Sequence, residues 1–218
     1  MNKISNKAKI FKDVNCKDSI INDYASVGDF SIIKDSSLKE YSRIDRYNYI
    51  LSSHIDRYSY TGRNTNILKS NIGSFTSISW NVTIGAGDHN YSTCSSHPFI
   101  NDHDRFMDER IGKDNYERFQ DNILIGNDVW IGCGAFIKRG IKIGNGSIVG
   151  ANSVVTEDIP DYAIVFGAPA RHFKYRFSED IIDLFLQMQW WNWPIEKIIE
   201  NIKILRKEPD IKILKKIL

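Results

Sequence analysis

The residue best suited to acid–base chemistry in this chain is His89, which follows Gly85, Gly87 and Asp88. An ordinary imidazole has a pKa of about 6.5, so it can take a proton from a hydroxyl or an amine near neutral pH. The two glycines predict a break in regular structure that lifts the His89 side chain into a cleft. A surface histidine hydrogen-bonded within a turn is the alternative interpretation.

A six-residue repeat must position this histidine. Aliphatic residues recur every six positions, at Ile125, Ile131, Ile137, Ile143, Val149 and Val155. Glycine directly follows four of these six residues. A second run contains one five-residue step, at Ile67, Ile72, Ile78 and Ile84, and a weaker run with slips covers residues 27–55. A period of six matches neither a helix nor plain strand alternation.

The repeat predicts short strands joined by tight turns, with three units forming a triangular coil of about 18 residues. Stacked coils bury the aliphatic side chains, and glycine or asparagine supplies the positive φ angles at the corners. The alternative is a chance run in an isoleucine-rich chain, which six consecutive hits oppose. We therefore expect a mainly β fold, with a coil domain over residues 1–175.

The repeat is interrupted once and then ends. We expect a loop excursion over residues 98–121, and long loops in compact domains are usually functional. A disordered insertion is the alternative, opposed by the apolar residues Phe99, Ile100, Phe106, Met107, Tyr116 and Phe119. A C-terminal helical segment over residues 176–218 should begin one helix after Ser178 and a second at Pro194.

Composition narrows the class of protein. The 218 residues are 42% hydrophobic and 26% charged, with a formal net charge of +2. This balance is typical of a folded globular protein and gives no strong field for nucleic acid or an anionic membrane. Three cysteines argue against a disulfide framework, and we see no secretory signal or apolar run long enough to span a bilayer. We expect a cytoplasmic protein without membrane insertion, nucleic-acid partner or metal.

Several motifs together resemble a known family. The hexapeptide phase, the segment at 127–132 (NDVWIG) and the turn at 167–170 (GAPA) resemble the left-handed β-helix acyltransferases. The GDH segment at 87–89, the HPF segment at 97–99 and the WWNWP tail at 190–194 resemble the xenobiotic acetyltransferase subfamily. That subfamily holds chloramphenicol and streptogramin acetyltransferases and relatives that acetylate polysaccharide sugars. The resemblance covers roughly residues 60–205.

The resemblance implies a left-handed parallel β-helix, acetyl-CoA as co-substrate, and a homotrimer with an active site at each subunit interface. It implies that His89 is the general base and that transfer is direct, so Cys94 is a packing residue and not a nucleophile. The positions that would line the donor groove are Trp130, Cys133, Gly150, Ala151 and Thr156, with Arg171 and Lys174 on the phosphates. Ordinary surface charge, and a coil-capping role for Trp130, are the alternatives.

The acceptor is expected to be a small molecule. Tyrosines and arginines alternate in one stretch, at Tyr41, Arg43, Arg46, Tyr47, Tyr49, Arg57, Tyr58, Tyr60 and Arg63. Aromatic faces stack on sugars and arginine pairs with phosphate, which favours a sugar or nucleotide sugar of bacterial surface-polysaccharide synthesis. Tyr60, Trp80 and Asn81 are the candidate pocket residues. The alternatives are coil-packing aromatics, an antibiotic-inactivating acetyltransferase, and a non-catalytic hexapeptide-repeat binding protein.

Overall fold

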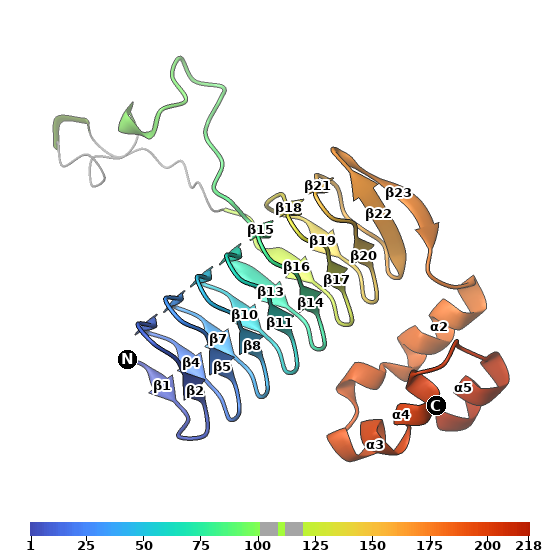
Figure 1. Cartoon of the computed structure of the whole chain (residues 1–218). Helices are drawn as coiled ribbons and strands as arrows, with labels where there is room; N and C mark the ends of the chain where they lie inside the picture. Colours follow the sequence, from blue (N-terminus) through green and yellow to red (C-terminus); the bar gives the residue numbers. More distant parts are fainter. Residues whose placement is uncertain (101–108, 112–119) are drawn as a thin grey trace.

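The structure, a computed structural model, describes residues 1–100, 109–111 and 120–218. Short strands follow one another around a prism and stack into three sheets, each parallel except at β23 (Figure 1). The first sheet contains β1 (Lys3–Ile4), β4 (Ile20–Ile21), β7 (Ser37–Leu38), β10 (His54–Ile55), β13 (Ser70–Ile72), β16 (Ile123–Ile125) and β19 (Lys142–Ile143). The predicted parallel β-helix is confirmed.

The other two faces complete each coil. The second sheet contains β2 (Lys9–Ile10), β5 (Ser26–Val27), β8 (Arg43–Ile44), β11 (Tyr60–Thr61), β14 (Ser77–Ile78), β17 (Trp130–Ile131), β20 (Ile148–Val149), β22 (Ala163–Gly167) and β23 (Ala170–Tyr175). The third contains β3 (Asn15–Lys17), β6 (Ile32–Lys34), β9 (Tyr49–Leu51), β12 (Asn66–Leu68), β15 (Thr83–Ile84), β18 (Phe136–Ile137) and β21 (Val154–Val155). Strand β23 runs antiparallel to β22 and closes this end of the second sheet.

Aliphatic columns fill the prism. One column runs through the third sheet with no solvent exposure, at Ile33, Ile50, Ile67, Ile84 and Ile137. Burying each such side chain contributes about 1.5–3 kcal/mol, so the columns dominate the stability of the coils. The six-residue phase identified this interior correctly from sequence.

The coil length changes along the prism. Ile20 pairs with Ser37 and Ser37 with His54, so equivalent positions of the N-terminal coils are 17 apart, one short of the prediction. Leu124 pairs with Lys142 and Phe136 with Val154, so the predicted spacing of 18 holds between β16 and β21. In the last coil Ile148 pairs with Ile164, a spacing of 16. The five-residue step recurs at the corner between the third and first sheets, where Asp35, Ser52 and Lys69 have φ between 44° and 48°. The slips in the N-terminal sequence are therefore regular, and the predicted coil length was wrong there.

A ladder of buried serines closes this short corner. The Ser53 amide donates to Ser36 Oγ at 3.1 Å, and the Ser70 amide donates to Ser53 Oγ at 3.1 Å. Each hydroxyl also donates within its own coil, as Ser53 Oγ does to the Leu51 carbonyl at 2.8 Å. The ladder therefore satisfies backbone groups that the tight turn leaves without a strand partner.

We expect Ser53→Ala to destabilise the chain by about 1–3 kcal/mol, because it leaves a buried amide without an acceptor. Urea unfolding followed by circular dichroism measures the effect. Ser26→Ala is the control, since Ser26 is half-buried on β5 and outside the ladder. Equal stability of the two variants would contradict a stabilising role for the ladder.

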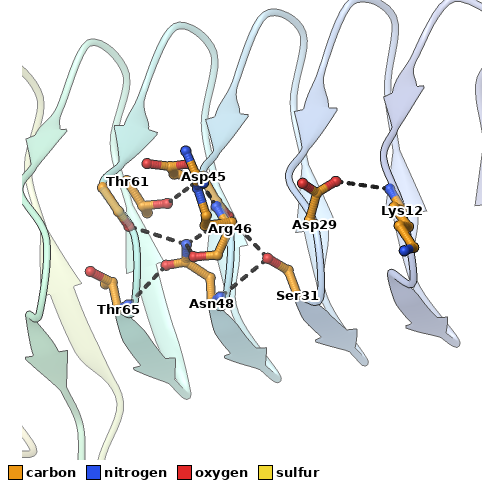
Figure 2. A network of polar contacts seen from close by, with 9 residues as sticks. Lys12, Asp29, Ser31, Asp45, Arg46, Asn48, Thr61 and Thr65 are labelled. Atoms are coloured by element: carbon orange, nitrogen blue, oxygen red, sulfur yellow. Dashed lines mark hydrogen bonds and ion pairs between the residues drawn. The ribbon is translucent and has the colours of Figure 1, made fainter.

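A second ladder lies at the corner between the second and third sheets (Figure 2). The Asn48 amide donates to Ser31 Oγ at 3.1 Å, and the Thr65 amide donates to Asn48 Oδ1 at 3.2 Å. The Asn48 side-chain amide also donates to the Asp45 carbonyl at 2.7 Å. Both ladders link neighbouring coils through side chains that the repeat places at fixed positions.

Helices follow β23, namely α2 (Glu179–Met188), η3 (Trp190–Asn192), α3 (Ile195–Glu200), α4 (Ile202–Leu205) and α5 (Ile211–Ile217). The predicted helix starts after Ser178 and at Pro194 are correct. Arg57 Nη2 fastens this tail to the coils by donating to the carbonyls of Trp191 and Trp193 at 2.7 and 2.6 Å. Near its start, Arg176 Nη1 donates to Asp128 Oδ2 at 3.1 Å. The tail is therefore held against the coils at two places.

Candidate active site

The segment that carries His89 leaves the prism directly after β15. Gly85, at φ 76°, is the last residue before the interruption whose amide donates to a carbonyl of the next coil, that of Ile137. The coil resumes at β16 with Ile123. Residues 86–97 contain no strand, and Figure 1 shows the chain extending away from the prism there. The interruption is thus longer than the predicted 98–121, because the aliphatic phase ends at Ile84 and not at Pro98. Of that predicted excursion, 101–108 and 112–119 lie outside the described residues.

The local geometry of His89 fixes which ring nitrogen is basic. His89 Nδ1 lies 2.7 Å from the carbonyl oxygen of Ser96, and the side chain is exposed. A carbonyl only accepts, so Nδ1 carries the proton in this contact. In the neutral imidazole, Nε2 then holds the lone pair. Sequence analysis did not identify Ser96, because a backbone carbonyl has no side-chain signature.

Two of the predicted donor residues share a face of the second sheet. Register places Trp130 beside Ile148, Ile148 beside Ile164, and Ile164 beside Lys174. At about 4.8 Å per strand, Trp130 and Lys174 are separated by roughly 14 Å along this column. Trp130 is 55% exposed there, so its indole is available to a ligand.

Arg171 joins the same face. It pairs with Phe166, two residues from Ile164, and a bulge near Ile164 brings Lys174 onto that side as well. Arg171 Nη1 lies 3.8 Å from Glu157 Oε1, and both side chains are exposed. Residues three apart in a regular strand point to opposite faces. Because of the bulge, Arg171 and Lys174 lie on the same face.

Cys133 and Ala151 form part of a column at the corner between the second and third sheets. The Gly134 amide donates to the Trp80 carbonyl at 3.1 Å, and the Asn152 amide donates to the Cys133 carbonyl at 2.8 Å. Trp80, Cys133 and Ala151 thus occupy equivalent positions on successive coils. This corner, which we call the donor corner after the role predicted for Cys133 and Ala151, borders the face that carries Trp130.

Gly150 has a packing role beside the predicted role toward a ligand. A Cβ at Gly150 would lie 2.7 Å from Phe166 Cβ, so its absence lets β22 approach β20. Close ligand approach was the reason predicted from sequence. The structure supplies a packing reason for the same residue.

Thr156 and the segment that carries His89 lie at the corner between the third and first sheets, where the third-sheet strands end. Thr156 follows β21, and the segment with His89 leaves after β15, so both come after the C-terminal ends of parallel strands. Cys133 and Ala151 precede strands of the same sheet, β18 and β21. In a single chain the segment with His89 therefore starts at the C-terminal ends of the third-sheet strands, and the donor corner lies at their N-terminal ends.

Two tyrosines of the predicted acceptor region, Tyr41 and Tyr58, pack between other rings. Tyr41 stacks between Tyr24 and Tyr58 with ring centroids 4.8 and 4.9 Å apart, and Tyr58 stacks on Phe75 at 5.0 Å. A ring that is covered on both faces in this way cannot stack on a sugar. The coil-packing alternative is therefore correct for Tyr41 and Tyr58.

Other predicted acceptor residues have different surroundings. Tyr60 is exposed on β11 and lines a shallow cavity of about 550 Å³ with Arg43 and Arg46. Trp80 is exposed at the donor corner. Asn81 has φ 58° and accepts from Asn64 Nδ2 at 2.8 Å, as a corner residue does. Of the three candidate acceptor residues, Tyr60 lines this cavity, whose lining contains neither Trp80 nor Asn81.

Two absences hold for the part of the chain that the structure describes. No helix in the described ranges is long and apolar enough to cross a membrane. Those ranges also contain no group of three or more histidine, cysteine, aspartate or glutamate side chains placed to hold a metal ion.

Known proteins with similar sequences are transferases. Residues 122–157 match the family described as bacterial transferase hexapeptide (six repeats). A chloramphenicol acetyltransferase of Morganella morganii is 43% identical over 61% of this chain and 63% of its own length. One from Klebsiella aerogenes is 45% identical over 57% of this chain and 60% of its own length. The chain thus spans somewhat under two thirds of the length of these relatives.

A solved structure supports the fold. A point mutant of AntD, an N-acyltransferase from Bacillus cereus in complex with dTDP-4-amino-4,6-dideoxyglucose and coenzyme A, superposes with a TM-score of 0.54. The superposition covers 82% of this chain and 91% of that one at 21% identity. At this identity the likeness concerns the fold alone.

Proposed function

We propose that this chain is a hexapeptide-repeat transferase that moves an acetyl group from acetyl-CoA to a hydroxyl or amine of a small molecule. The observation that carries the proposal is His89, held through Nδ1 by the Ser96 carbonyl on a segment that leaves the prism. The relatives named chloramphenicol acetyltransferases support the reaction class. Calorimetry with acetyl-CoA separates an enzyme from a non-catalytic repeat protein, which would show no binding.

His89 supplies the proton chemistry in this proposal. As the acceptor attacks the thioester carbonyl, Nε2 takes the proton from the acceptor hydroxyl or amine. The resulting imidazolium keeps its Nδ1 hydrogen bond to the Ser96 carbonyl, which stabilises the positive ring. Nε2 then returns the proton to the departing thiolate. The acetyl group moves directly between the substrates, so no covalent acetyl-enzyme is required.

The donor groove is proposed along the outer face of the second sheet and its corner. Trp130 and Cys133 would line the pantetheine arm, and Ala151 would border its path one coil further on. Thr156 follows the C-terminal end of β21, away from the donor corner, so it would meet the same ligand only as a residue of a second copy of the chain. Arg171 and Lys174 would meet the nucleotide phosphates at the far end of the face.

Removing both cations should weaken the enzyme's hold on the donor phosphates. Hydrogen bonds to charged groups are worth roughly 1.5–3 kcal/mol each, and exposed pairs less. We expect Arg171→Ala/Lys174→Ala to raise the KM for acetyl-CoA by about tenfold, an effect of about 1.4 kcal/mol. The KM for the 3′-dephospho donor should rise less.

Lys142→Ala is the control for that double variant, because Lys142 is an exposed cation on the first sheet. Initial-rate kinetics with both donors measure the effect. Equal increases in KM for the two donors would show that neither cation contacts the 3′-phosphate.

We also propose that active sites form between copies of the chain, as a homotrimer would provide. The supporting observation is that the segment with His89 follows the C-terminal end of a third-sheet strand, whereas Cys133 and Ala151 precede the N-terminal ends of such strands. A neighbouring copy of the chain would bring its His89 segment, at the ends of its own third-sheet strands, against this donor corner. Each site would then combine the base of one chain with the groove of another.

For the acceptor, we propose an antibiotic-like hydroxyl compound, with a sugar or nucleotide sugar as the second class. Identities of 43% and 45% to chloramphenicol acetyltransferases support the first class. Tyr41 and Tyr58 do not support a sugar acceptor, because other rings cover them. Tyr60, Arg43 and Arg46 line one cavity and still support it. Comparing kcat/KM for chloramphenicol, a streptogramin and nucleotide sugars separates the two classes.

A further inference from the structure

Arg139 is a buried cation at the base of the segment that carries His89. Its side chain follows β18 on the next coil and is only 7% exposed. Nη1 donates to the Asp121 carbonyl at 2.9 Å, and Nη2 donates to the Gly85 carbonyl. Gly85 is where the chain leaves the prism, and Asp121 lies two residues before it returns at Ile123. One guanidinium group therefore binds both ends of the interruption.

The surrounding coils explain why such a contact is needed. In the preceding coils this corner is closed by the serine ladder, which ends with Ser70 donating to the Leu68 carbonyl at 2.8 Å. The next coil has no closed corner, because the chain leaves at Gly85 instead of turning into the first sheet. Arg139 bonds the backbone carbonyls on both sides of this open corner.

The residue type suits the task. Burying a cation is costly unless it is hydrogen-bonded, and the two carbonyls that accept from Nη1 and Nη2 contribute to that stabilisation. A planar guanidinium presents donors in a rigid fork, which can hold two acceptors at a set separation. Gly85 and Gly140 adapt the backbone around it, with φ values of 76° and 75°. A Cβ at Gly140 would lie 3.2 Å from Asp121 Cβ, so this corner is tightly packed.

We propose that Arg139 is a positioning residue for His89, an inference that rests on the proposed function. It fixes the two ends of the excursion, and His89 lies only four residues beyond the carbonyl of Gly85 that Arg139 holds. Arg139 does not contact the reacting atoms in this proposal. It acts by setting the direction in which the His89 segment leaves the prism.

The first test compares Arg139→Met with Lys138→Met, which removes an exposed cation from the adjacent position. Because small misplacements of catalytic groups cost up to about 100-fold, we expect Arg139→Met to lower kcat by roughly 10–100-fold. The KM for acetyl-CoA should stay within about twofold, because the donor groove is unchanged. A kcat equal to that of Lys138→Met would overturn the proposal.

The second test is a double-mutant cycle with His89→Ala. If Arg139 acts by positioning His89, Arg139→Met should lower kcat no further once His89 is gone. An equal loss in both backgrounds would mean that Arg139 acts independently of His89, and would overturn the proposal. If His89→Ala alone leaves kcat unchanged, the proposed function fails instead, so the two failures are distinguishable.

Folding of the variants is checked by circular dichroism and thermal unfolding. Should Arg139→Met not fold, the same cycle uses Arg139→Lys, which keeps the charge and most of the packing but not the fork. A loss of kcat that occurs only when His89 is present supports the proposal. No loss, or the same loss in both backgrounds, contradicts it.

Discussion

Replacing His89 with alanine is expected to lower kcat by about 10²–10⁴-fold, the usual contribution of a positioned general base. Acetyl-CoA binding and folding should change little, because His89 is exposed and lies outside the coils. The expected loss is one of chemistry, since the Ser96 carbonyl fixes a proton on Nδ1 and leaves Nε2 to accept the proton of the acceptor. Steady-state kinetics with a confirmed acceptor measure it.

Two residues on the same segment give matched controls. His97→Ala removes an imidazole whose Nδ1 accepts from the Phe99 amide at 3.1 Å, and Cys94→Ala removes an exposed thiol. Both should retain most of the activity. An unchanged kcat in His89→Ala would refute this mechanism.

Blocking the donor groove should have the second large effect. Ala151 is exposed at the corner, so Ala151→Trp places a large ring outside the coil without filling the core. We expect acetyl-CoA binding to be lost in calorimetry while the circular dichroism spectrum is retained. The reason is steric, since the indole would occupy the path proposed for the pantetheine arm.

Arg46→Trp is the control for that block, because Arg46 occupies the equivalent corner position four coils away. It should bind acetyl-CoA as the wild type does. Mixing the His89→Ala and Ala151→Trp chains then tests the sharing of sites. If sites form between copies, some hybrid sites carry neither change, and activity should return. Tight acetyl-CoA binding by Ala151→Trp would place the donor elsewhere.

Much of the fold could be predicted because one physical requirement repeats in every coil. An aliphatic side chain must point inward on each face, so residues such as Ile131 and Ile137 show the phase directly. The shorter N-terminal coils were harder to recognise, because their corner depends on a serine ladder and not on aliphatic residues. Serine is common on surfaces, and its burial at Ser53 is evident only when coils are stacked.

The candidate site could be predicted only in part. Trp130, Arg171 and Lys174 were named from sequence and do lie on one face, but the bulge that aligns the two cations had no sequence signal. Ser96 and Arg139 were missed because the contacts that matter are to backbone carbonyls, whose positions depend on where the chain leaves the prism. The tyrosines Tyr41 and Tyr58 were overinterpreted, since stacked rings and sugar platforms use the same residue type.

The central claim is that acetyl transfer depends on an acceptor and proceeds directly from acetyl-CoA. Release of free coenzyme A thiol, followed with a thiol reagent, tests it most directly, with chloramphenicol, a streptogramin and nucleotide sugars as acceptors. We predict rapid release with at least one acceptor, an acetylated product in its mass spectrum, and no acetylated protein when the acceptor is omitted. Release that is no faster with any acceptor than without one, or accumulation of acetylated protein, would contradict the account.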